Sequence, residues 1–81
     1  MSIINSSATV AVNQTGTSSV IGASPSAGVH CNVSDTYRLY FQDGSTADLV
    51  LVSGNCYPYR VTKILTTGGG AVDSGDVYLL L

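Results

Sequence analysis

Charged side chains are scarce in this sequence. Only 10% of its 81 residues are charged, the net charge is −2, and the basic residues are limited to Arg38, Arg60 and Lys63. A nucleic-acid interface neutralises phosphates with a cluster of Lys and Arg, so we expect no nucleic-acid partner. With 44% hydrophobic residues, the chain is too apolar for disorder and carries little charge for the surface of a lone domain. We expect neighbouring chains to cover much of its exterior.

Helix-forming signals are also missing. Every acidic residue is Asp, which favours turns and caps, and the helix-favouring Glu does not occur. No segment repeats apolar residues at i, i+3 and i+4 over three turns, and no run approaches the ~20 apolar residues of a membrane helix. Short β-forming runs alternate instead with turn signals. The sequence therefore predicts an all-β fold, a small antiparallel β-sandwich or barrel of about six strands, with no membrane partner.

Cysteine and histidine are too few for a disulfide framework or a complete set of zinc ligands. The start of the chain lacks a basic segment followed by a sustained apolar run, so we expect no secretory signal, and assembly in a cytoplasm. There Cys31 and Cys56 would stay reduced as small buried side chains; a Cys31–Cys56 disulfide is the alternative. His30 has no acidic or Cys partner nearby in sequence, which favours a surface or interface position.

Two further patterns bear on phosphate binding and on calcium binding. Gly68-Gly69-Gly70 lacks the Lys-Ser/Thr of a phosphate-binding loop and is not followed by a helix. Asp73 and Asp76 could join a calcium site, but two carboxylates three residues apart are ordinary in a polar turn. We therefore predict no catalytic residues, no metal site, no cofactor and no enzymatic activity.

The size of the chain makes association important. A domain of this length hides only roughly 60–65% of its unfolded surface, and small domains compensate with disulfides, a metal or subunit contacts. Residues 1–28 carry no charge and are rich in Ser, Thr, Ala and Gly. They fit either a flexible linker or, as we favour, an extended N-terminal arm lying on a neighbouring subunit, followed by a β domain over residues 29–81.

The end of the chain is apolar on both faces of its predicted strand, residues 77–81. Such a strand must be covered twice, as a central strand or at a subunit interface. The arm and this strand together supply the predicted interface residues, which are Ile3, Ile4, Val10, Val12, Tyr78, Leu79, Leu80 and Leu81.

A hairpin is predicted around Asp43-Gly44, between two runs of strand-forming residues. A three-residue loop, Asp43-Gly44-Ser45, would pair Leu39 with Leu49 and place Arg38 and Asp48 diagonally on the polar face, with Gly44 left-handed. The residues expected to face the core are Tyr37, Leu39, Phe41, Ala47, Leu49 and Leu51.

From Arg38 onward the order of signals resembles one family. Asp43-Gly44-Ser45-Thr46 precedes a strand, and Pro58-Tyr59-Arg60-Val61-Thr62-Lys63-Ile64-Leu65-Thr66-Thr67-Gly68 leads to the final apolar strand. This resembles the head-spike base proteins of tailed phages and gene transfer agents, in which a Pro-x-Arg-Val-x-Lys/Arg-Val/Ile-Leu-x-Thr-Gly segment has the same place. The resemblance covers a little over half of the chain and does not extend to the N-terminal third.

The resemblance implies a non-enzymatic virion protein on the capsid exterior, serving as a spike base or decoration subunit. Its expected partners are further copies of itself in a ring or trimer, the major capsid protein, and a spike or fibre protein. Two alternatives remain open at this point. One is a tail fibre or connector subunit, and the other is a small carbohydrate-binding module that uses outward tyrosines such as Tyr40.

Overall fold

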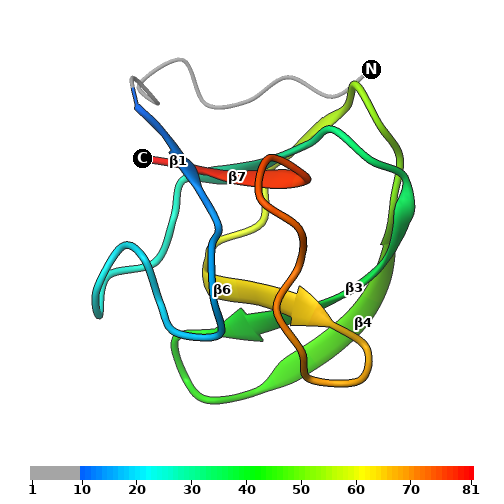
Figure 1. The fold of residues 1–81 in the computed structure, drawn as a ribbon. Coiled ribbons are helices and arrows are strands. Elements are labelled where there is room, and N and C mark those ends of the chain that lie inside the picture. The colour runs from blue at the N-terminus through cyan, green and yellow to red at the C-terminus, as the bar shows by residue number, and fades with distance from the viewer. Residues whose placement is uncertain (1–9) are drawn as a thin grey trace.

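A computed structural model describes residues 10–81, and these form seven strands and no helix. The strands are β1 (Ala11–Asn13), β2 (Gly28–Cys31), β3 (Asp35–Phe41), β4 (Thr46–Leu51), β5 (Cys56–Tyr57), β6 (Val61–Thr66) and β7 (Val77–Leu80). They build two antiparallel sheets, with strand orders β1-β7-β2-β5 and β4-β3-β6 (Figure 1). The predicted all-β fold is thus confirmed. Among the described residues there is no helix able to cross a membrane.

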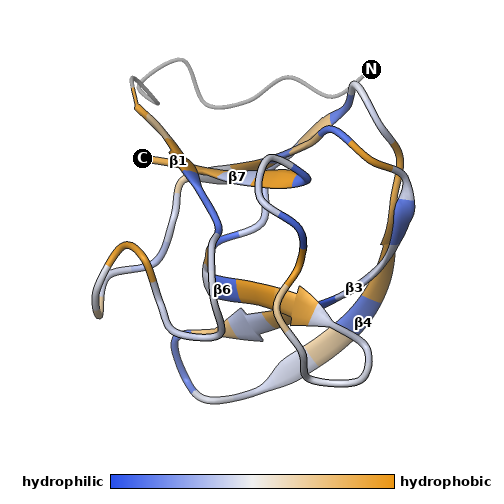
Figure 2. Ribbon diagram, viewed as in Figure 1, coloured by the Kyte–Doolittle hydropathy of each residue, from blue (hydrophilic) through white to orange (hydrophobic). Residues whose placement is uncertain are grey.

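Both sheets contribute to one hydrophobic core. Inward-facing residues of β2 and β7 meet those of β3, β4 and β6. Figure 2 shows the orange of apolar residues along much of β7 and in the later part of β6. Because side chains alternate between the faces of a strand, each strand needs only every second residue to be apolar on that side. The buried cluster consists of Val29, Cys31, Tyr37, Leu39, Leu51, Val61, Ile64, Val72, Val77 and Leu79.

The hairpin of β3 and β4 has the predicted loop length but a different register. The Phe41 amide donates to the Ser45 carbonyl at 2.9 Å and the Gly44 amide donates to the Phe41 carbonyl at 3.0 Å, so the loop is Gln42-Asp43-Gly44. Gly44 has φ 89°, as predicted. A type I turn followed by a left-handed bulge residue needs glycine in the third loop position. The predicted loop had put Gly44 second, which was wrong by one residue.

This correction moves the pairing by two residues and leaves the faces unchanged. Leu39 pairs with Ala47 rather than Leu49, and Arg38 lies directly opposite Asp48 rather than diagonal to it. Because side chains alternate with a period of two, a two-residue shift returns every residue to the same side. The six residues expected on the core face are accordingly buried or half-buried, whereas Val50 on the other face is exposed.

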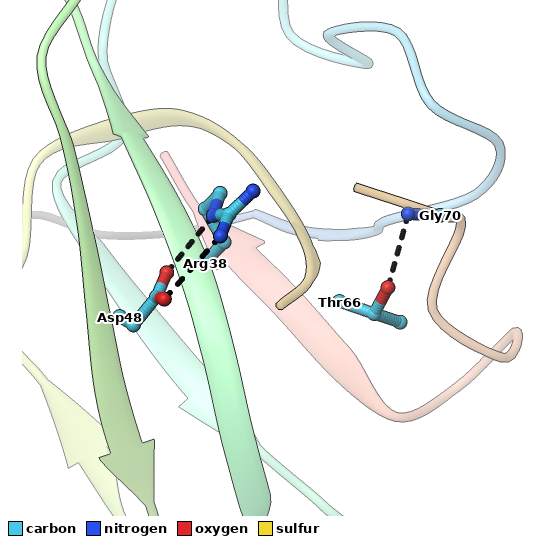
Figure 3. Close-up of polar contacts among 4 residues, drawn as sticks. All are labelled: Arg38, Asp48, Thr66 and Gly70. Carbon is cyan, nitrogen blue, oxygen red and sulfur yellow. Dashed lines mark hydrogen bonds and ion pairs between the residues drawn. The ribbon is translucent and has the colours of Figure 1, made fainter. Parts of the chain in front are cut away.

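The glycine tract after β6 repeats the loop of the first hairpin. The Thr66 amide donates to the Gly70 carbonyl at 2.9 Å, and the Gly69 amide donates to the Thr66 carbonyl at 2.9 Å. Gly69, like Gly44, is left-handed, with φ 84°. The Thr66 hydroxyl also accepts the Gly70 amide at 3.0 Å (Figure 3). The tract therefore has a turn-forming role.

Residues 57–66 largely alternate between apolar and polar side chains, as one strand would, but they belong to two sheets. Pro58 has no amide hydrogen for a ladder, and β5 ends just before it while β6 begins at Val61 in the other sheet. A bulge at Thr62 follows, since Phe41 pairs with Val61 but Tyr40 pairs with Lys63. The extra residue brings both Val61 and Ile64 into the core. Strict alternation without a bulge would put these two side chains on opposite faces.

The described part of the N-terminal segment packs on its own chain. β1 pairs with β7, and the side chains of Gln14 and Ser26 are fully buried. The Ser26 hydroxyl forms two hydrogen bonds with the backbone near the start of β6. It donates to the Tyr59 carbonyl and accepts the Val61 amide, both at 3.1 Å. Residues 1–9 lie outside the described part of the chain, so the arm prediction remains open for them.

Candidate functional site

The edges of the two sheets differ in how well they are protected from pairing with another chain. Exposed edge strands invite such pairing unless they are short, kinked, or interrupted by Pro or Lys. β1 has three residues, β5 has two and is followed by Pro58, and β6 contains the bulge and Lys63. β4 has six residues in regular register and contains neither Pro nor Lys. Among the described strands, none pairs with its outer edge.

The orientation of the β4 backbone follows from the hairpin loop. Phe41 and Ser45 form a hydrogen-bonded pair, and such pairs alternate with pairs whose amides point away from each other. The amides of Thr46, Asp48 and Val50 therefore face the open edge. This edge offers three donors and three acceptors to a strand from another chain.

Apolar side chains lie beside this open edge. Val50 is 68% exposed on the outer face of β4, and Val52, just beyond the strand, is exposed as well. The Ser53 amide donates to the Ser34 hydroxyl at 2.8 Å, which brings the equally exposed Val33 to the same end of the sheet. We call Val33, Val50 and Val52 the valine patch. Large exposed apolar residues that gather in one place are typical of contact surfaces.

The one acidic side chain on β4 is already paired. Arg38 Nε lies 2.9 Å from Asp48 Oδ1 and Arg38 Nη2 lies 3.4 Å from Asp48 Oδ2, across the outer face of the hairpin (Figure 3). The hydrogen bond from Arg38 holds the pKa of the Asp48 carboxyl below its usual range. An inward or outward charge can protect an edge, but this one is balanced by its partner.

The predicted interface residues occupy three kinds of position. Leu79 is fully buried in the core of its own chain, since β7 lies between β1 and β2. Val12, Tyr78 and Leu80 are half-buried, whereas Val10 and Leu81 are exposed and adjacent, with the Leu81 amide donating to the Val10 carbonyl at 2.8 Å. Ile3 and Ile4 lie outside the described residues.

The β4 edge was missed in the sequence, although a signal for it exists. Once the hairpin faces are assigned, Val50 stands out as an apolar residue on the polar face. Tyr40, which had suggested a sugar platform, has Lys63 Nζ over its ring at 4.5 Å from the centroid. That face of the ring is therefore already occupied by a cation.

A second group of residues lies on the outer face of the other sheet. His30 Nδ1 is 3.1 Å from Cys56 Sγ, and His30 Nε2 is 2.8 Å from Asn32 Oδ1. This Cys partner of His30 could not be seen in the sequence, because Cys56 is 26 residues away and only strand pairing brings it near. Cys31 and Cys56 are both free thiols. The predicted alternative of a disulfide between them is wrong, because Cys31 faces the core and Cys56 does not.

Comparisons with protein-family models, with curated proteins and with solved structures gave no match.

Proposed function

We propose that this chain is a non-enzymatic structural protein of a virion, a spike base or decoration subunit on the capsid exterior that assembles with copies of itself. The single observation that carries the proposal is the open β4 edge with the valine patch beside it. A long regular edge strand with exposed apolar residues is an aggregation hazard in a solitary domain. In a subunit of an assembly, the same strand can form the contact with a neighbouring chain. The resemblance to head-spike base proteins supports placing the assembly on a virion.

The low charge of the chain supports the same proposal. Solitary small domains keep themselves soluble with about 25–35% charged surface residues, whereas this chain has 10% charged residues overall. Within residues 10–81 the large exposed apolar residues are the valine patch, beside the β3–β4 hairpin, and the Val10–Leu81 pair, beside β1 and β7 of the other sheet. Two unlike contact surfaces are what a head-to-tail ring or trimer requires, because each subunit meets its neighbours through different faces.

In this proposal the β4 edge accepts a strand of the neighbouring chain. Backbone hydrogen bonds to the amides of Thr46, Asp48 and Val50 supply affinity, and burial of the valine patch supplies the apolar contribution. Burying an exposed Val side chain stabilises by about 1.5 kcal/mol or more. The remaining exterior is available for contacts with the major capsid protein and a spike or fibre protein.

The test is the concentration-dependent sedimentation of the native chain and of Val50→Pro. Proline at residue 50 removes an amide that points to the open edge and leaves the β3–β4 ladder intact. We expect the native chain to sediment as an oligomer and Val50→Pro to sediment as a folded monomer. Val50→Thr is the matched control, since it keeps the amide and the β-branched shape and should still associate.

Two outcomes would contradict the proposal. One is a native chain that stays monomeric at all concentrations and does not co-sediment with capsids. The other is a Val50→Pro variant that associates as the native chain does, which would show that the β4 edge is not the contact. A co-sedimentation signal with isolated tails rather than capsids would move the protein to the tail.

A further inference from the structure

Four residues form a straight row on the outer face of the β1-β7-β2-β5 sheet. Asn13 pairs with Tyr78, Tyr78 pairs with His30, and His30 pairs with Cys56, one residue from each strand. The neighbouring row, which includes Val29, points into the core. Because successive residues alternate between faces, the row with His30 and Cys56 points away from the core. Both side chains are half-buried.

His30 contacts two side chains of different character. Its Nδ1 lies 3.1 Å from Cys56 Sγ, and its Nε2 lies 2.8 Å from Asn32 Oδ1. Asn32 is itself fixed, because its Nδ2 donates to the Gly75 carbonyl at 2.9 Å and its amide donates to the Asp76 carbonyl at 2.8 Å. The Cys, His and Asn side chains are thus connected in one line.

The hydrogen bond to Gly75 decides which nitrogen of His30 carries a proton. Asn32 must present its NH₂ group to the Gly75 carbonyl, so its carbonyl oxygen is the atom that faces His30. An amide oxygen only accepts, and His30 Nε2 is therefore the protonated nitrogen. In the neutral ring Nδ1 is then the acceptor, and it faces the Cys56 thiol. Asn32 holds the imidazole in the form that can take the thiol proton.

The charge around this group is simple. His30 is flanked by Tyr78 from β7 and by Cys56 from β5, and Tyr57 follows Cys56 along its strand. The nearest carboxylate-bearing residue in these contacts is Asp76, which takes part through its backbone carbonyl. Within residues 10–81 the one ion pair joins two side chains of the other sheet. Among residues 10–81, His30 therefore forms no ion pair with a carboxylate.

The two thiols of the chain differ in access. Cys31 is fully buried, its Sγ donates to the Val33 carbonyl at 3.1 Å, and burial raises the pKa of this thiol. Cys56 lies on β5, the two-residue strand at the edge of its sheet, and is partly exposed. A reactive thiol needs both an adjacent base and access to its reaction partner, and only Cys56 has both.

We propose that Cys56 is a nucleophilic thiol that exchanges with disulfides, with His30 as its base and Asn32 as the positioning residue. The Cys56 proton passes to His30 Nδ1, and Sγ attacks one sulfur of the disulfide. A new S–S bond forms to Cys56 while the original S–S bond breaks. The departing thiolate takes up the proton from His30, so that Cys56 is oxidised and the leaving sulfur is reduced. The site would join this chain covalently to a disulfide-bearing molecule, independently of the proposed virion role.

The probe for this site is an aromatic disulfide, 5,5′-dithiobis(2-nitrobenzoate), whose reduced half absorbs visible light. The folded native chain at pH 7 should release one equivalent rapidly, and mass spectrometry should place the adduct on Cys56. Unfolding in urea should expose Cys31 and release the second equivalent. We expect His30→Ala to slow the rapid phase about tenfold or more, as loss of a general base does.

Two controls separate base catalysis from a structural effect. Tyr78→Phe changes the other neighbour of His30 in the same row, keeps the ring, and should leave the rate unchanged. The effect of His30→Ala should shrink at pH 9.5, because a more alkaline solvent supplies the base that the variant lacks. Asn32→Ala should slow the reaction at pH 7 and recover in the same way.

The result that would overturn the proposal is equally direct. If His30→Ala, shown to be folded by circular dichroism, reacts at the native rate at pH 7, then His30 is not a base for Cys56. A native rapid phase no faster than that of the unfolded chain, or an equal loss of rate at pH 7 and pH 9.5, would also contradict it.

Discussion

Ser26→Ala tests how the N-terminal segment is held on the domain. The Ser26 hydroxyl forms hydrogen bonds with two backbone groups where the chain enters β6. It accepts the Val61 amide and donates to the Tyr59 carbonyl. Both Ser26 and Val61 are fully buried. Removing the hydroxyl leaves these two groups without this partner, and an unsatisfied buried polar group costs about 1–3 kcal/mol. We expect a loss of about 2–3 kcal/mol in the free energy of unfolding.

Urea unfolding at one fixed protein concentration measures this loss. With a slope of about 1 kcal/mol per molar for a small domain, the midpoint should fall by about 2–3 M, and the melting temperature by roughly 8–24 °C. Ser24→Ala is the matched control, because it makes the same change at an exposed position two residues earlier and should stay within about 0.5 kcal/mol. A Ser26→Ala variant as stable as Ser24→Ala would refute the packing of this segment on its own chain.

Two further outcomes follow from the core and from the outer face. Leu79→Ala should lower the free energy of unfolding by about 2–5 kcal/mol in the same urea assay, because it leaves a cavity in the core. Leu81→Ala, at an exposed position, should change it by less than about 0.5 kcal/mol. Similar values for both variants would contradict the position of β7. Arg38 holds the pKa of Asp48 below its ordinary value, so the pair stabilises the fold above about pH 4 and loses this contribution as the pH falls through the lower folded value. Asp48→Asn should therefore lose less stability than the native chain between about pH 5 and pH 2, and an identical acid profile would show that the pair contributes nothing.

The faces of the strands could be predicted from the sequence, whereas the exact pairings could not. Alternation of apolar residues assigned Tyr37, Leu39 and Leu51 to the core, and all three are buried. The register depended on which residue of a short loop is left-handed, and moving Gly44 from the second to the third loop position shifts every pair by two. Periodicity cannot detect such a shift, because it restores every face.

The strand irregularities and the long-range contacts could not be predicted from the sequence. The bulge at Thr62 exchanges the two faces for the residues of β6 that follow it, and no residue type in that segment predicts a bulge. The contact of His30 with Cys56 depends on β5 pairing with β2, a choice made by the order of the sheet. The open edge of β4 depends on the same order, since a strand can be recognised in a sequence without showing whether it lies at an edge.

We propose that another chain covers the β4 edge in the native assembly. An electron-microscopy map of that assembly tests it most directly. We expect a neighbouring chain to run alongside residues 46–50, within hydrogen-bonding distance of the amides that face the edge, and to cover the exposed side chain of Val50. A map in which this edge faces solvent, with the subunits joined elsewhere, would contradict it.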